Sequence, residues 1–124
     1  MSEATAPLFR QIATLIEDAI AEESLREGER APSTNELANF HNINPATARR
    51  GLGLLVASAV LEKRRGVGMF VAQGAKERIV VRRREEFAAL YLAPLIDEAV
   101  KLDMSRAELH SLVERVAESR GMYH

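Results

Sequence analysis

Basic side chains are concentrated in the middle of this 124-residue chain, between Asn44 and Arg84. The stretch holds ten lysines and arginines against two glutamates, a net charge of +8, whereas residues 1–43 hold three against eight and residues 85–124 four against eight. A positive segment between acidic ends is typical of a protein that lays one surface against a polyanion, the chemistry of nucleic-acid binding. We therefore expect these cations to gather on a single face. For the run 82–84 taken alone, a solvated charged surface is the alternative.

Three cations stand directly beside two glycines in the segment Lys63-Arg64-Arg65-Gly66-Val67-Gly68. Glycine lets a backbone approach another surface closely, and guanidinium groups next to it are suited to pairing with phosphate. The same glycines are also what an ordinary hairpin turn requires. Both interpretations stay open on the residues alone.

The sequence contains no comparable cluster of residues suited to catalysis or metal binding. The chain lacks cysteine, which excludes disulfides, thiolate nucleophiles and cysteine-based zinc sites, and its histidines, His41, His110 and His124, are scattered. Glu85 and Glu86 are adjacent acids without an accompanying base or ligand set, as on an exposed helix face. We therefore predict that the protein is not an enzyme and has no catalytic residues, no metal and no cofactor.

Length and hydropathy limit the architecture. A chain of this size has room for one core and an appendage, and an effector-binding domain of its own is hard to accommodate. No segment approaches the ~20 apolar residues that span a bilayer, and the N-terminus lacks a signal-peptide pattern. We expect a soluble, cytoplasmic protein with no membrane partner.

The first cations of the basic segment follow two helix-start signals. Ser33 and Glu36 form a capping box, which predicts a helix from Thr34 to about residue 40. After the turn 41–43, Asn44 as N-cap and Pro45 at the first helical position predict a second helix of about a dozen residues. Two short helices joined by three residues, the second basic on its outer face, form a helix-turn-helix. The side chains expected to face inward from the second helix are Ala48, Leu52, Leu55 and Val56.

Elements on either side complete a small domain. Apolar residues at helical spacing predict an amphipathic helix from Pro7 to about residue 24. Residues 60–64 and 69–72 are predicted to form two strands around the glycine-bearing tip, a wing, with Phe70 and Val71 packed in the core. Gly51 and Gly53 each weaken the second helix of the helix-turn-helix by about 1 kcal/mol relative to alanine, so we expect them to permit close packing against the first.

A helical pattern resumes at Lys76 and continues to about residue 102. Pro94 removes a donor and clashes with the carbonyl of Leu90, which predicts a bend or break there. Ser105 and Glu108 form a second capping box that opens a final helix, ending near residue 119. The apolar surface of the helical pattern from Lys76 to about residue 102 is too wide to be covered by a single packing partner. The sequence thus predicts a mainly α fold with a small β-hairpin: a winged helix-turn-helix in residues 1–74 and a helical tail in residues 75–124.

The stretch from Leu25 to Val71 resembles the DNA-binding domain of the GntR family of bacterial transcription regulators. The two-helix tail is similar to that of the YtrA-like branch, whose members lack a large ligand domain and use the tail to dimerise. With the first helix included, the resemblance spans essentially the whole chain. It is carried, in the family's order, by Gly28, Pro32-Ser33, Glu36-Leu37-Ala38, Ile43-Asn44-Pro45-Ala46-Thr47, Arg49, Leu52, Leu55 and Gly66-Val67-Gly68-Met69-Phe70-Val71.

The resemblance implies that Thr47 and Arg49 contact DNA and that Gly66 enters the minor groove. Arg49 is the strongest candidate, because its planar fork of donors can pair with guanine or clamp a phosphate. Arg50 is either a phosphate contact or solvated. The DNA-binding set that we predict comprises Ser33, Asn35, Asn44, Ala46, Thr47, Arg49, Arg50, Arg64, Arg65 and Gly66. The dimer interface that we predict comprises Phe87, Leu90, Tyr91, Leu95, Ile96, Leu109, Leu112, Val113 and Val116.

Three positions depart from the family pattern. Asn35 stands where many relatives have a DNA-contacting arginine, which reduces its expected role to a single hydrogen bond. Pro45 occupies a position that is often polar or basic, and Ala59 replaces the common glycine that ends the recognition helix. These departures bear on the operator sequence more than on DNA binding itself.

The expected function is that of a transcription regulator, most simply a repressor, that binds a palindromic operator in double-stranded DNA as a homodimer. One alternative is a protein-interaction module that acts through its helical tail. Another is an architectural protein that binds DNA without sequence preference. A small-molecule effector between the tails stays open, although no polar constellation indicates one.

Overall fold

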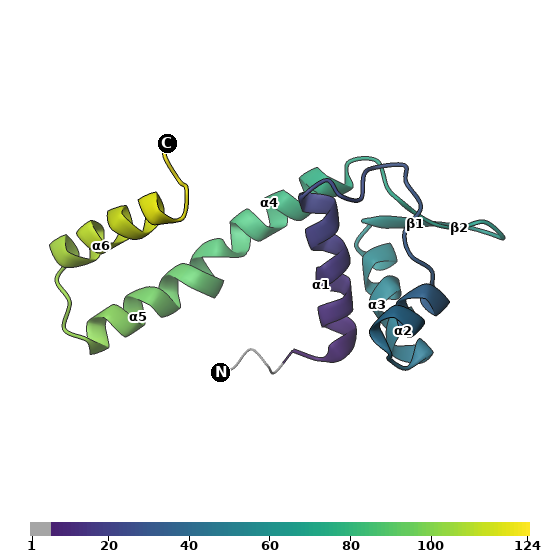
Figure 1. The fold of residues 1–124 in the computed structure, drawn as a ribbon, viewed down its shortest axis with the longest axis horizontal. Helices are drawn as coiled ribbons and strands as arrows, with labels where there is room; N and C mark the ends of the chain where they lie inside the picture. Colours follow the sequence, from purple (N-terminus) through teal and green to yellow (C-terminus); the bar gives the residue numbers. More distant parts are fainter. Residues whose placement is uncertain (1–5) are drawn as a thin grey trace. The chain divides into compact units, whose positions relative to one another are not determined.

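The computed structural model describes residues 6–124 and consists of helices and one two-stranded antiparallel hairpin, the predicted fold class. The chain divides into two compact units, one ending at Arg83 and the other comprising Arg84–His124. In the first unit, α1, α2 and α3 lie together and the hairpin projects from them (Figure 1). Its elements are α1 (Leu8–Ala21), α2 (Thr34–His41), α3 (Pro45–Ala57), β1 (Leu61–Arg64), β2 (Gly68–Val71) and the start of α4 (Ala75–Phe87).

Local signals begin and end these helices where the sequence predicts. At the start of α2, the Glu36 amide donates to Ser33 Oγ at 3.1 Å, and the Ser33 amide donates to Glu36 Oε1 at 2.8 Å. These Ser33 hydrogen bonds also lower the pKa of Glu36 below its ordinary value. Asn42 ends α2 in the left-handed region, and Asn44 Oδ1 accepts from the Ala46 amide at 2.8 Å to begin α3.

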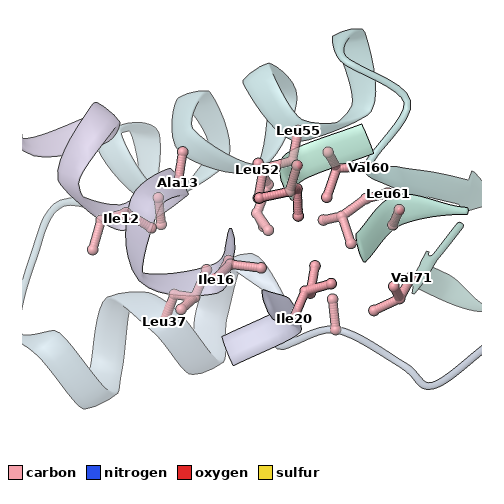
Figure 2. Close-up of a cluster of buried hydrophobic side chains, with 14 of the residues drawn as sticks. Ile12, Ala13, Ile16, Ile20, Leu37, Leu52, Leu55, Val60, Leu61 and Val71 are labelled. Atoms are coloured by element: carbon pink, nitrogen blue, oxygen red, sulfur yellow. The ribbon is translucent and has the colours of Figure 1, made fainter. Parts of the chain in front are cut away.

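The core of the first unit contains side chains from α1, α2, α3, the start of α4 and the hairpin, many of which Figure 2 shows. Burying each of its large aliphatic side chains contributes about 1.5–3 kcal/mol. Two expectations were wrong: Val56 is exposed, and Phe70 is only half-buried because its ring supports a cation on the hairpin surface. The largest fully buried side chains are Ile12, Ile20, Leu52, Leu55, Val60, Leu61, Val71 and Ile79.

The two glycines of α3 have different surroundings. A Cβ on Gly51 would lie 2.8 Å from the carbonyl oxygen of Phe9 and 3.2 Å from Cγ2 of Ile12, whereas a Cβ on Gly53 would meet nothing within 4 Å. Close packing is therefore confirmed for Gly51, although the neighbour is α1 and not the first helix of the helix-turn-helix. For Gly53 the expectation was wrong.

We expect Gly51→Ala to lower the free energy of unfolding by about 1–3 kcal/mol, because α1 and α3 must separate to admit the methyl group. Gly53→Ala is the matched control on the same helix. It should leave stability unchanged or raise it by up to about 1 kcal/mol, since alanine is the better helix former. Urea denaturation followed by circular dichroism measures both, and equal effects would contradict the packing argument.

Ala59 follows α3 with a φ of +62°, the left-handed conformation that glycine adopts most readily. The segment is held by Arg78, which donates from Nη2 and Nε to the Ala59 carbonyl oxygen at 2.8 and 3.2 Å. Ala59, which stands where the family usually has glycine, thus adopts the backbone conformation that glycine would adopt after α3, but with conformational strain.

Ala59→Gly should therefore raise the free energy of unfolding by about 1 kcal/mol, the approximate cost of placing an L residue in this region. Thermal unfolding of the purified variant tests the prediction. An unchanged or lowered midpoint would show that the strain at Ala59 is negligible.

The second unit, described by itself, contains the remainder of α4, a π-helical segment η2 (Ala88–Leu92), α5 (Ala93–Lys101) and α6 (Arg106–Ser119). The predicted break at Pro94 is absent, because the chain stays helical through this residue; instead, the π-helical turn that ends at Leu92 widens the helix where proline lacks its amide donor. Ser105 and Glu108 form the predicted capping box of α6, with bonds of 2.8 and 3.1 Å. Ala99 is the buried residue of α5.

Candidate nucleic-acid interface

A hollow of about 480 Å³ lies between the start of α2, the middle of α3 and the hairpin. Its apolar floor includes Leu52 and Met69, which belong to the core or pack against it. Four cations line it: Arg30, Arg49, Lys63 and Arg64. A concave surface of this kind, bordered by a helix and a cationic hairpin, can receive an anionic backbone together with the edges of the groups attached to it.

The two consecutive arginines of α3 point to different surroundings. Arg49 lines the hollow, whereas the guanidinium of Arg50 lies 3.8 Å from the centre of the Phe9 ring, on the side of α1. A cation–π contact of this kind contributes about 0.5–1 kcal/mol at an exposed site. The structure therefore separates the two residues, and Arg49 is the one placed among the other cations of the hollow.

The hairpin presents its positive charge in a fixed position. Strands β1 and β2 pair antiparallel, with Arg64 opposite Gly68, as the predicted wing requires. The Arg64 guanidinium lies 4.1 Å from the centre of the Phe70 ring and 3.2 Å from Glu62 Oε1. Because both members of this ion pair are about half exposed, it contributes little to stability, and Arg64 stays accessible to a stronger anion.

The other predicted DNA-binding residues divide between the hollow and its surroundings. Ser33, Asn35 and Gly66 line the hollow together with Arg49 and Arg64. The remainder lie outside its lining: Asn44, Ala46, Arg50 and Arg65 are exposed, and Thr47 is half-buried in the first turn of α3.

Sequence reasoning did not include Arg30 in the site, and it counted Lys63 only as charge near the wing. Arg30 belongs to the acidic first third of the chain, so the local charge pattern gave no reason to select it. Its proximity to the hairpin arises from tertiary pairing, since Arg30 forms an isolated antiparallel bridge with Phe70.

The expectation that all cations of residues 44–84 gather on one face was wrong. Lys76 Nζ pairs with Glu23 at 2.8 Å, which lowers the pKa of Glu23, and Arg78 binds backbone carbonyls. Arg82 donates two bonds, of 2.7 and 3.0 Å, to the buried carboxylate of Glu17. Arg83 pairs with Asp18 at 2.8 Å. The physical reason is that the acidic side of α1 attracts the cations of α4 and holds them there.

The nine residues predicted to form a dimer interface all belong to helical segments from the end of α4 onward. Eight of them have 37–65% of their surface exposed, and Leu109 is partly exposed. Exposed apolar side chains in this number, within a unit of 41 residues from Arg84 to His124, are typical of a surface that binds another protein.

Two further observations concern other kinds of site. Over residues 6–124, no helix combines the length and hydropathy needed to cross a bilayer. The described part of the chain also contains no group of three or more histidine, aspartate or glutamate side chains placed to hold a metal ion.

Comparison with protein families matches residues 8–71 to the model described as bacterial regulatory proteins, gntR family. The chain is 26% identical to the HTH-type transcriptional regulator YhcF of Bacillus subtilis, over 86% of this chain and 87% of that protein. It is 23% identical to the HTH-type transcriptional repressor YtrA of the same organism, over 91% of this chain and 86% of YtrA. Both matches extend beyond the winged domain into the tail.

Solved structures show the same similarity. A transcriptional regulator of the GntR family from Bacteroides thetaiotaomicron has a TM-score of 0.75 and 29% identity, covering 93% of this chain and all of that one. The DNA-binding domain of AraR in complex with operator ORX1 has a TM-score of 0.54 and 29% identity, covering 58% of this chain and 87% of AraR's domain. The similarity thus includes a domain that was solved on operator DNA.

Proposed function

The chain belongs to the GntR family of bacterial DNA-binding transcription regulators, and from this premise we propose that it is a repressor that binds a palindromic operator as a homodimer. The observation that carries the proposal is the cationic hollow between α2, α3 and the hairpin. In this arrangement α3 enters the major groove and the hairpin tip, with Gly66, approaches the minor groove. The repressor assignment rests on the name of YtrA, to which the chain is similar along most of its length.

Arg49 is proposed to read a base edge, and Ser33, Asn35 and Arg64 to position the protein on the phosphate backbone around it. Asn44, Ala46 and Thr47 stand at the beginning of α3, where Asn44 and Ala46 are exposed and the positive end of the helix dipole favours a nearby phosphate. Arg65 at the hairpin tip adds charge. Among these residues, Arg50 is the weakest candidate for a DNA contact, because its guanidinium already lies on the Phe9 ring.

The tail, residues 75–124, is proposed to hold two copies together through its exposed apolar side chains. One short helix and one hairpin bury too little surface for tight, selective binding, so two sites on one DNA are needed. Two recognition helices of a dimer would enter successive major grooves, about 34 Å apart. As a regulator of this kind the protein would work in the cytoplasm, would not be an enzyme and would need no cofactor.

Selection of duplexes from a random-sequence library by the purified full chain tests the proposal. We expect the selected sequences to share a two-fold symmetric motif with half-sites one helical turn apart, and light scattering to report a dimer. Enrichment of no motif, with equal binding to all duplexes, would favour an architectural protein. Failure to bind any duplex would favour a protein-interaction module that acts through the tail.

A further inference from the structure

Residues 28–31 add a third strand-like segment to the hairpin. The Ala31 amide donates to the Met69 carbonyl oxygen at 2.8 Å, and the Val71 amide donates to the Glu29 carbonyl oxygen at 2.9 Å. The segment thereby occupies the edge of β2 that β1 leaves unpaired, and Arg30 lies opposite Phe70. This backbone pairing fixes Arg30 at the base of the hairpin, close to the first turn of α2.

The side chain of Arg30 lies against Gly68. A Cβ on Gly68 would stand 2.9 Å from Arg30 Nε and 3.5 Å from its Nη2, so any side chain at position 68 would displace the guanidinium. Gly68 has a φ of +140°, which also disfavours other residues. Besides closing the hairpin, Gly68 therefore provides the space in which the Arg30 side chain lies.

The Arg30 guanidinium makes no hydrogen bond or salt bridge within the part of the chain that the structure describes. This distinguishes it from Lys76, Arg78 and Arg83, each of which is held by a carboxylate or a carbonyl. Arg30 is exposed and lines the same hollow as Arg49. A cation that is positioned by backbone pairing but has no hydrogen-bonded anion is available to an external one.

We infer that Arg30 binds a phosphate of the DNA backbone beside Gly68 of the wing, and that Gly68 is needed to place it there. This inference rests on the proposed function. It adds a positioning contact from a segment outside the helix-turn-helix and the hairpin strands, in the same hollow that Arg49 lines. Because a phosphate contact carries no sequence information, Arg30 would increase affinity for every duplex by the same factor.

The test measures fluorescence anisotropy of a labelled duplex selected by the wild-type protein and of a mixed-sequence duplex, each over a range of salt concentrations. Arg30→Ala should weaken binding to both duplexes equally, by about tenfold. The slope of log K against log salt should fall in magnitude by about 0.9 for each phosphate that is no longer neutralised, or about 1.8 for a dimer. Arg30→Lys should restore the slope, because lysine keeps the charge. Arg120→Ala, an exposed arginine in the tail, is the control and should change neither quantity.

Gly68→Ala provides a second, independent test. It should weaken binding in the wild-type background and have a smaller effect when combined with Arg30→Ala, because the side chain that it displaces is then absent and only the backbone strain at a φ of +140° remains. Circular dichroism at the assay temperature checks that each variant is folded.

An unchanged salt slope in Arg30→Ala would overturn the inference, as would a loss confined to the selected duplex, since that result would indicate base reading. Additive effects of the Gly68 and Arg30 substitutions would overturn the role of Gly68. If the wild-type protein bound no duplex, the proposed function would fail and the inference with it. If the wild-type protein binds selectively but the Arg30→Ala variant has the same salt slope as the wild type, the inference about Arg30 fails and the proposed function stands.

Discussion

Replacing Val113 with aspartate should abolish the proposed dimer and weaken operator binding by about 10²–10⁴-fold. Val113 lies on α6 with 47% of its surface exposed, beside Leu112 and Val116 on the same side of the helix. A carboxylate there would have to be desolvated in any apolar interface, which costs several kcal/mol. A monomer loses the advantage of binding the second half-site from an already bound partner.

Ser111→Asp is the matched control, because it adds the same charge to the opposite side of α6. Light scattering reports the mass of each variant and anisotropy titration reports its affinity for the selected duplex. Helix content by circular dichroism should be the same in both. A Val113→Asp protein that remained a dimer, or a Ser111→Asp protein that dissociated equally, would contradict the assignment of this face.

Arg49→Ala should abolish most of the preference for the operator over mixed-sequence DNA. A guanidinium paired with a base edge contributes about 1–3 kcal/mol of discrimination, so two copies in the proposed dimer correspond to a loss of about 30-fold to 10⁴-fold in relative affinity. Arg49 is exposed and lines the hollow between the helices and the hairpin, where a base edge has access to it. The measurement is the ratio of affinities for the selected duplex and for a duplex with substituted half-sites.

Lys76→Ala is the control for loss of charge. Its ammonium group is paired with Glu23 at 2.8 Å, away from the hollow, so its removal should leave the affinity ratio unchanged. Arg49→Ala should also differ from Arg30→Ala, which is expected to lower affinity without altering preference. Equal loss of preference in the Arg49 and Lys76 variants would refute the role of Arg49.

The local elements could be predicted well from the sequence. The capping boxes at Ser33 and Ser105 and the N-cap at Asn44 act through bonds between residues a few positions apart, and all three are present. Helical periodicity also identified three of the four residues predicted to face inward from α3, namely Ala48, Leu52 and Leu55. The prediction that Val56 faces inward was wrong because periodicity locates the buried face of a helix only to within about one residue. The edge of that face depends on which other elements pack against it.

The candidate site was predictable only in part. Five of the ten predicted DNA-binding residues line the hollow. Of these, Arg49 and Gly66 were predicted from the family resemblance and Arg64 from the positive charge beside the wing glycines, and both signals are local in sequence. Arg30 was missed, since its position depends on pairing with a strand about 40 residues further along the chain. No window of sequence around Arg30 contains that information.

The sequence by itself thus determined the order and type of the elements, the family, and the presence of a strong positive charge in the middle of the chain. Only the tertiary structure decided which of those charges face outward. Glu17 and Asp18 of α1 engage Arg82 and Arg83, and Phe9 engages Arg50, which leaves the cations around the hollow to bind an external anion. The reason is physical: hydrogen bonds that form helices and turns join near neighbours, whereas the pairing of a charged side chain depends on which distant segment folding brings beside it.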